Sequence, residues 1–194
     1  MIIGVLGVQG NLEEHIAATK DALLKLGKKG DVILVRNKAG LDKTDGLIIS
    51  GGESTTMWKL LKKTGLFEDL KKYKKPIFGT CAGLILLAKS ASESDKDSKK
   101  TGQEFLGKLD IVVNRNAFGR QVDSFSVDID FAGKPFNAVF IRAPAIERVG
   151  RKVHVLARYG NKIVAARQGN IIVTAFHPEL TNDTRVHEFF IRTV

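Results

Sequence analysis

The first half of the chain alternates between short apolar runs and longer segments with helical spacing. Residues 2–8 form an apolar run that ends in glycine-rich sequence, which predicts a buried strand. Asn11, with Glu14 three residues later, resembles a capping box and opens a predicted helix that Gly27 ends. We expect the apolar face of this helix to consist of Leu12, Ile16, Ala17, Leu23, Leu24 and Leu26.

The same alternation continues to about residue 90. Apolar runs predict further strands over residues 32–35, 46–49 and 76–79. Ser54 is a good N-cap for a helix that passes through Met57, Leu60 and Leu61, and further helices are predicted over residues 66–72 and 82–89. Strands that alternate with helices indicate a parallel sheet with crossover helices.

The second half follows a different pattern. Residues 125–131 alternate strictly between apolar and polar, and residues 138–141 form another apolar run. Three short strands follow, separated by Gly-Asn turns, which predicts an antiparallel meander over residues 153–159, 163–167 and 171–176. A helix over residues 183–191 closes the chain, and the polar segment 91–104 reads as an exposed loop.

These patterns predict one α/β domain over residues 1–194. We expect a mostly parallel open sheet flanked by helices, of the flavodoxin-like type, with the antiparallel meander in its C-terminal half. The fractions of hydrophobic residues (43%) and charged residues (27%) suit an ordinary globular domain. No apolar run is long enough to span a bilayer, and the N-terminus lacks a basic region and a cleavage site, so we predict a cytoplasmic protein without a membrane partner.

The net charge of +10 raises the question of a nucleic-acid partner. The lysines, however, fall mainly in pairs such as Lys62-Lys63 and Lys71-Lys72, without interleaved aromatic residues or a nucleic-acid motif. This pattern favours a solvated face over an acidic partner protein or a nucleic acid, and we predict no nucleic-acid partner.

Cys81 is the single cysteine of the chain and cannot form an intramolecular disulfide. It lies in Gly79-Thr80-Cys81-Ala82-Gly83, a G-x-C-x-G pattern between a predicted strand and a predicted helix. The glycines allow a tight, strained turn that would lift the thiol clear of the sheet, and the following helix start would favour the nucleophilic thiolate. The alternative is an inert cysteine buried in a core.

A cysteine nucleophile needs a base, and the base needs an orienting group. Of the four histidines, His15 and His187 fall in predicted helices and His154 in a strand, whereas His177 stands at the end of the last strand. Pro178 stiffens the turn after His177, and Glu179 is close enough to bind one imidazole nitrogen while the other faces the thiol. Read alone, His-Pro-Glu is more often a surface turn, and only its combination with the cysteine turn favours the catalytic interpretation.

An acyl-transfer site also needs donors for an oxyanion. Gly51-Gly52 follows a strand and precedes a helix, so its backbone amides can approach a ligand closely, although a simple glycine turn is the alternative. The histidines and the single cysteine show no metal-ligand spacing, so we predict no metal site.

Together these features resemble a known family. G-x-C-x-G followed by His-Pro-Glu resembles the class I, triad-type glutamine amidotransferases. The segments GVLGVQGN, SGGESTTM, FGTCAGLILLAK, VNRNAFGRQVDSF, FIRAP and FHPEL occur in this order and are similar to the glutaminase subunits of deoxyxylulose-independent pyridoxal 5′-phosphate synthases. The resemblance runs from the first predicted strand to the last helix.

The resemblance implies hydrolysis of L-glutamine to L-glutamate and ammonia, without a cofactor. Cys81 would be the nucleophile, His177 the general base and then acid, and Glu179 the group that orients His177. Six residues match the family's substrate-binding positions: Gly52, Glu53, Ser54, Arg115, Ile141 and Arg142. The implied oxyanion hole consists of backbone amides of Gly51, Gly52, Gln9 and Gly10.

Arginine and a carboxylate suit the α-carboxylate and α-ammonium of glutamine. The sequence does not assign these groups to the two ends of the substrate, and Arg115 and Arg142 are alternatively surface or structural ion-pair residues.

The family also implies a partner. This would be a synthase subunit with a (β/α)8 barrel, which forms a hetero-oligomer with the glutaminase and condenses its ammonia with a pentose and a triose phosphate. The loop Val8-Gln9-Gly10-Asn11 would sense this partner and complete the oxyanion hole on docking. The alternatives are a glutaminase for another synthase, such as that for imidazole glycerol phosphate, a non-catalytic binding module, and a cysteine hydrolase for other substrates.

Overall fold

The computed structural model describes residues 1–92, 101–115, 117–118 and 124–194. Most of the predicted loop over residues 91–104 and most of the segment NAFGRQ lie outside the described residues. The strands are β1 (Ile2–Leu6), β2 (Asp31–Val35), β3 (Gly46–Ile49), β4 (Ile77–Thr80), β5 (Ala88–Ala91), β6 (Leu109–Asn114), β7 (Ser124–Phe131), β8 (Lys134–Ile141), β9 (Ala145–Val149), β10 (His154–Tyr159), β11 (Lys162–Gln168) and β12 (Ile171–Thr174).

The strands form one sheet with a parallel part and an antiparallel part. Along its main path the order is β2-β1-β3-β4-β12-β11-β10-β7-β8. Strands β2, β1, β3, β4 and β12 pair in parallel, and the pairs from β12 to β8 are antiparallel. Beside this path, β5 pairs in parallel with β6, and β9 bridges β6 and β11. The predicted fold class is therefore confirmed, because the parallel strands β2-β1-β3-β4-β12 have the strand order of flavodoxin-like sheets.

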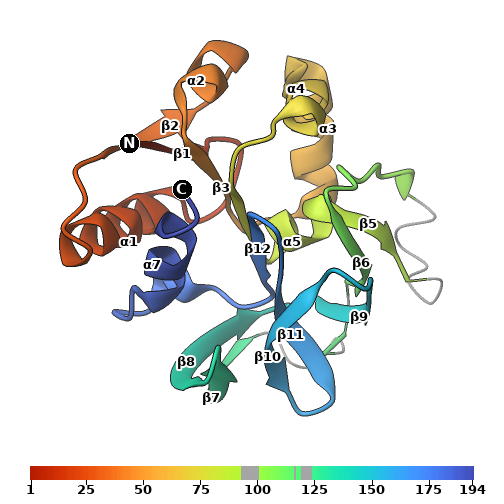
Figure 1. The fold of residues 1–194 in the computed structure, drawn as a ribbon. Coiled ribbons are helices and arrows are strands. Elements are labelled where there is room, and N and C mark those ends of the chain that lie inside the picture. The colour runs from red at the N-terminus through yellow and green to blue at the C-terminus, as the bar shows by residue number, and fades with distance from the viewer. Residues whose placement is uncertain (93–100, 116, 119–123) are drawn as a thin grey trace.

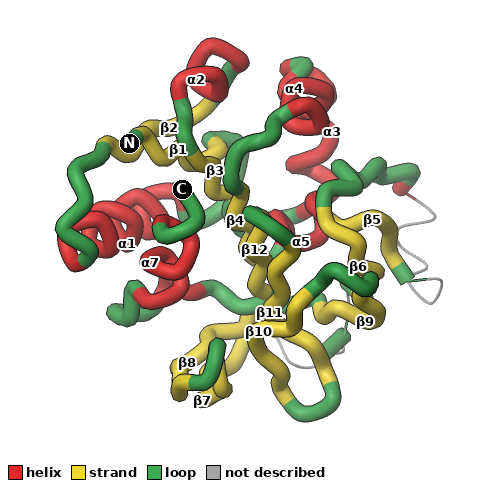
Figure 2. The backbone as a smooth tube through the Cα atoms, in the orientation of Figure 1, coloured by secondary structure: helices red, strands yellow, loops and turns green. Residues whose placement is uncertain are grey.

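Helices cover the parallel part of the sheet on both faces. They are α1 (Leu12–Lys25), α2 (Lys38–Lys43), α3 (Ser54–Thr64), α4 (Leu66–Lys72), α5 (Ala82–Leu87), the 3-10 turn η1 (Pro178–Leu180) and α7 (Arg185–Ile191). Helices α1 and α7 pack together on one side of the central strands, and α3 and α5 lie on the other side (Figures 1 and 2). No helix in the described part of the chain is long and apolar enough to cross a membrane.

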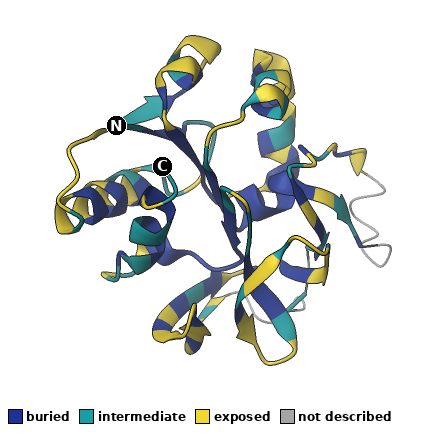
Figure 3. Cartoon of the chain, in the orientation of Figure 1, coloured by how far each residue is buried: buried dark blue, intermediate teal, exposed yellow. Residues whose placement is uncertain are grey.

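Burial follows from this layering. All residues of β3 and β4 are buried, as expected for central parallel strands with helices on both faces (Figure 3). The antiparallel strands are half-buried: β8 buries Phe136, Ala138 and Phe140 on one face and leaves its intervening residues more exposed. Each Å² of apolar surface removed from water contributes roughly 25 cal/mol. This burial stabilises the parallel part of the sheet, and with it the loops that follow its strands.

Several predicted elements differ in extent or were not expected. The helix after Cys81 ends at Leu87 rather than residue 89, because Ala88 already pairs with β6. Elements α2, β5, β6 and β9 were not predicted. Helix α2 buries only Leu41, and β5 buries only Ala88, so neither leaves a hydrophobic period that a sequence pattern can detect.

The start of α3 differs from its prediction. Glu53, not Ser54, is the N-cap, and its carboxylate accepts hydrogen bonds from the backbone amides of Thr55 and Thr56. The buried Ser54 hydroxyl instead donates to Gln103 Oε1 at 3.0 Å. A carboxylate at a helix N-terminus is also favoured by the helix dipole.

The predicted face of α1 was wrong in part. Leu24 is 78% exposed and Ala17 is exposed, whereas the buried stripe consists of His15, Ala18, Thr19, Ala22 and Leu23. These positions keep helical spacing, but the stripe includes a histidine and a threonine that an apolar pattern does not select. The expected capping box is also absent, since the Asn11 side chain makes no cap hydrogen bond.

Candidate active site

The candidate residues gather at the carboxyl edge of the parallel strands. Gly10 follows β1, Gly51 follows β3, Cys81 follows β4 and His177 follows β12. These four strands are direct neighbours in the order β1-β3-β4-β12. The topology therefore brings together loops that are up to 167 residues apart (10 to 177) in the sequence, at the edge where α/β sheets bind ligands.

Cys81 occupies a strained turn between β4 and α5. Its backbone has φ 49° and ψ −102°, a conformation that residues with a side chain rarely adopt. The flanking glycines make room for it: a Cβ at Gly83 would lie 2.1 Å from Ile49 O, and one at Gly79 would lie 2.8 Å from the Gly83 carbonyl carbon. Strain of this kind, held by close packing, is typical of a nucleophile elbow.

His177 and Glu179 form a tight buried pair. His177 Nδ1 lies 2.7 Å from Glu179 Oε1, and both side chains are almost completely buried. The His177 backbone amide donates to Val139 O at 2.8 Å, which ties the end of β12 to β8. With Nδ1 committed to the carboxylate, Nε2 remains for the thiol, as in a catalytic triad.

The electrostatics of this pair favour its charged form. Burial lowers the pKa of His177, but its hydrogen bond with Cys81, its hydrogen bond with Glu179 and the charges of both groups outweigh that effect and raise the pKa to about 10. Burial raises the pKa of Glu179, yet His15, His177 and Asn11 together lower it well below its usual range. The site therefore holds an imidazolium against a carboxylate at neutral pH.

Gly51 lies directly against the candidate nucleophile and base. A Cβ at Gly51 would lie 2.5 Å from His177 Cε1 and 3.5 Å from Cys81 Cβ, so only glycine fits here without displacing the imidazole. Among the described residues, no hydrogen-bond partner is found for the backbone amides of Gly51 and Gly52. Two such amides beside a thiol could donate to an oxyanion.

The loop after β1 closes over Gly51. A Cβ at Gly10 would lie 2.3 Å from Gly51 O, so the two glycine backbones are in direct contact. Gln9 Oε1 accepts a hydrogen bond from the Glu53 amide at 3.1 Å, and its side chain packs against Gly52. The structure thus brings together all four residues predicted for the oxyanion hole.

The turn after β8 supplies the next part of the site. Cys81 Sγ lies 3.9 Å from Ile141 O, and Arg142 follows with φ 43°. Ile141 and Arg142 are both exposed. These two residues therefore border the thiol on the solvent side.

Glu53 and Arg115 form the rim on the α3 side. Arg115 Nη2 lies 3.4 Å from Glu53 Oε1 and 3.3 Å from Thr55 Oγ1. The Glu53 carboxylate is half-exposed, and hydrogen bonds from Thr55 and Thr56 overcome its desolvation and lower its pKa. The predicted substrate residues are therefore grouped, except that the Ser54 hydroxyl is turned inward to Gln103.

Two residues at the site were missed by the sequence analysis. Asn11 Nδ2 donates to Glu179 Oε1 at 3.0 Å, and His15 Nε2 lies 3.4 Å from Glu179 Oε2. Asn11 was interpreted as a helix cap and as part of the partner-sensing loop, without a contact to the triad, and His15 was set aside because it falls in a helix. A histidine that begins a buried helical stripe was the available signal for the second residue.

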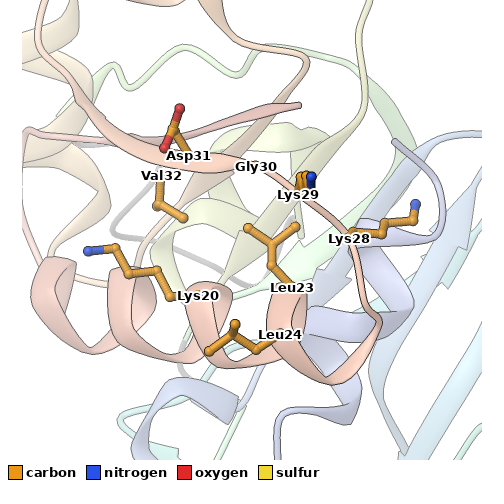
Figure 4. A pocket seen from close by; sticks show the side chains of 8 residues that line it. All are labelled: Lys20, Leu23, Leu24, Lys28, Lys29, Gly30, Asp31 and Val32. Atoms are coloured by element: carbon orange, nitrogen blue, oxygen red, sulfur yellow. The ribbon is translucent and has the colours of Figure 1, made fainter.

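The described residues also contain a hollow that lies apart from this site. Within the described residues, no group of three or more His, Cys, Asp or Glu side chains could hold a metal ion. A separate hollow of ≈ 590 Å³ lies beside α1 near the start of β2, at the opposite edge of the sheet (Figure 4). It is lined by Lys20, Leu23, Leu24, Lys28, Lys29, Gly30, Asp31 and Val32, which include no cysteine, serine or histidine.

Comparisons with known proteins identify the family of this chain. The model of the SNO glutamine amidotransferase family matches residues 5–194. A pyridoxal 5′-phosphate synthase subunit PdxT of Archaeoglobus fulgidus is 52% identical, covering 99% of this chain and 98% of the relative. The same subunit of Pyrococcus furiosus is 51% identical, covering 99% and 98%.

Solved structures give the same result. A crystal structure described as a glutamine amidotransferase is 42% identical, covers 100% of this chain and 98% of its own, and superposes with a TM-score of 0.85. A glutamine amidotransferase of Thermotoga maritima is 14% identical, covering 96% of this chain and 79% of its own, with a TM-score of 0.56, and this likeness shows the fold alone. On the family model and the full-length relatives together, the chain belongs to the SNO glutamine amidotransferase family.

Proposed function

We propose that this chain hydrolyses L-glutamine to L-glutamate and ammonia through a thioester on Cys81. It passes the ammonia to a synthase subunit that makes pyridoxal 5′-phosphate from a pentose and a triose phosphate. The family and the relatives' names support the reaction and its pathway. The observation that carries the mechanism is the buried pair of His177 Nδ1 and Glu179 Oε1, 2.7 Å apart, beside the strained Cys81.

In the first half of the reaction, His177 holds the proton that the Cys81 thiol has given up, and the Cys81 sulfur attacks the amide carbon of glutamine. The raised pKa of His177 keeps the proton on the imidazole until the C–N bond breaks. That proton then passes to the leaving nitrogen, and ammonia departs from the glutamyl thioester. The amides of Gly51 and Gly52 are placed to stabilise the oxyanion, with Gln9 and Gly10 completing that loop.

In the second half, water attacks the thioester carbon. His177 takes a proton from this water and returns one to the sulfur when the C–S bond breaks, which releases glutamate. Glu179 orients the imidazole and stabilises its cation in both halves, since its pKa is held low. Each proton therefore passes through one imidazole.

Glutamine binding is assigned to the rim of the site. Arg115 and Arg142 suit the α-carboxylate, and Glu53 suits the α-ammonium. Ile141, whose carbonyl lies near the thiol, borders the reacting amide, and Gly52 and Ser54 shape the turn that carries Glu53. The Glu53–Arg115 contact holds both groups at the rim before substrate arrives.

The partner is part of the proposal. We assign it a (β/α)8-barrel fold and a hetero-oligomer with this chain, on the family resemblance. The loop from Val8 to Asn11 touches Gly51 through Gly10 and Glu179 through Asn11, so docking near this loop can act on both the oxyanion donors and the triad. A cytoplasmic location and a single domain over residues 1–194 remain predictions from the sequence.

The proposal is tested by a glutaminase assay on wild type and Cys81→Ala, each with and without a synthase subunit. We expect turnover that rises on addition of the partner and is lost in Cys81→Ala. Activity that survives in Cys81→Ala would contradict the mechanism. Equal turnover with and without the partner would contradict only the role given to the N-terminal loop.

A further inference from the structure

Two completely buried histidines stand behind Glu179. His15, on α1, has its Nε2 atom 3.4 Å from Glu179 Oε2, and its Nδ1 atom 3.1 Å from His187 Nε2 on α7. Both histidines are 0% exposed. The other carboxylate oxygen, Oε1, already binds His177 and Asn11. The buried groups therefore form a row: His187, His15, Glu179 and His177.

The row has a preferred arrangement of protons. Burial lowers the pKa of His15, and it lowers the pKa of His187 to about 3, so both are neutral at neutral pH and each has one ring N–H. Glu179 Oε2 is buried and makes no hydrogen bond to the described residues, and His15 Nε2 lies 3.4 Å from it. The same His15 nitrogen lies 3.2 Å from the Thr80 hydroxyl, which can accept from it or donate to it. A buried carboxylate oxygen needs a donor, which favours the His15 proton on Nε2.

The second histidine fixes that tautomer. With its proton on Nε2, His15 has a free lone pair on Nδ1, which can accept only if His187 carries its own proton on Nε2. His187 Nδ1 is then an acceptor without a partner among the described residues, which is less costly than an orphaned N–H. In the opposite arrangement His15 Nε2 would accept from the Thr80 hydroxyl, but its lone pair would also face the Glu179 anion and leave Oε2 without a donor.

We propose that His15 is a positioning residue for this reaction, whose Nε2–H holds the Glu179 carboxylate toward His177, and that His187 selects the required His15 tautomer. The inference rests on the proposed function. A neutral donor suits this place, because a cation at His15 would compete with the His177 imidazolium for the same carboxylate. The charged groups acting on His15 are Glu179, His177 and the nearby Glu14.

The tautomer is measured directly on the wild-type protein by NMR of ¹⁵N-labelled histidine. We expect His15 protonated at Nε2 and accepting at Nδ1, and His187 protonated at Nε2. A proton on His15 Nδ1 would overturn the inference and leave the proposed function untouched. This readout does not depend on any variant that folds poorly.

Kinetics in the complex with a synthase subunit test the functional part. His15→Leu removes the N–H, and we expect kcat to fall about tenfold or more, with little change in KM for glutamine. The pH dependence of kcat/KM in His15→Leu also changes. Without the donor the pKa of Glu179 rises, so the acid limb of this profile moves to higher pH. His15→Gln, which keeps an N–H near the Nε2 position, should recover most of the rate and the profile.

In His187→Leu, kcat should fall and the acid limb should shift in the same direction as in His15→Leu, but by less. The matched control is His154→Leu, at an exposed histidine on β10, which should keep wild-type kinetics. A folded His15→Leu with wild-type kcat and acid limb would overturn the inference, as would a His15→Gln no better than His15→Leu. Absence of Cys81-dependent turnover in the wild type would instead overturn the proposed function.

Discussion

The buried centre and the exposed rim of the candidate site are built in different ways. At the centre, Cys81, His177 and Glu179 are almost fully buried, and each is fixed by strain or by short hydrogen bonds. At the rim, Glu53 is half-exposed and Arg142 is exposed, and Glu53 and Arg115 contact each other at 3.4 Å. The difference indicates that the chemistry is organised before substrate binds, whereas the binding groups can rearrange around it.

The largest expected effect comes from removing the base at the centre. His177→Ala leaves Cys81 without a proton acceptor, and we expect kcat to fall about 10³-fold or more, with little change in glutamine binding. Steady-state kinetics with the synthase subunit measure both parameters. A variant that loses affinity for glutamine but keeps its rate would reverse the division between centre and rim.

The next effect comes from filling the space over the thiol. Gly51→Ala places a methyl group 2.5 Å from His177 Cε1, so the imidazole or the loop must move, and we expect about a 10²-fold loss of kcat. Gly40→Ala in α2 is the control, because its Cβ would make only ordinary contacts of 3.5 Å or more and leave activity unchanged. Normal turnover in Gly51→Ala would show that this packing is not needed.

A rim substitution should act on binding instead. Arg115→Ala removes a guanidinium assigned to the substrate, and we expect KM to rise about tenfold while kcat stays within a few fold of wild type. Arg158→Ala, at an exposed position on β10, serves as the control. A fall in kcat as large as that of His177→Ala would place Arg115 in the catalytic centre.

The smallest effect is on stability, and its sign follows from the His177 pKa. This pKa is about 6.5 when unfolded and is raised to about 10 in the folded protein, so the stabilisation is fully present below pH 6.5 and is lost as the pH rises toward 10. The free energy of unfolding should decline progressively across that window. In Glu179→Gln the free energy of unfolding should decline less over the same pH range. An equal decline would show that the His177–Glu179 pair does not raise the His177 pKa.

The sequence predicted the centre better than its surroundings. Cys81 and the His-Pro-Glu segment are marked by local patterns, because a tight turn needs glycines at fixed offsets and a stiff turn needs proline. The parallel pairing of the strands in the first half followed from their alternation with helices. The family prediction is confirmed by the model that matches residues 5–194.

What the sequence could not show depends on contacts between distant segments. Asn11 has the spacing of a helix cap, and only the fold turns its side chain toward Glu179, 168 residues away. His15 and His187 are 172 residues apart, and α1 and α7 bring them together. Glu53 replaced Ser54 as the cap because its longer carboxylate reaches two amides.

The thioester itself is the most direct test of the central claim. The complex with the synthase subunit is quenched in acid during glutamine turnover, digested, and examined by mass spectrometry. We predict one glutamyl group attached through sulfur to the peptide that contains Cys81, and its absence in Cys81→Ala. Continued turnover with no adduct on Cys81, or an adduct on another residue, would contradict the account.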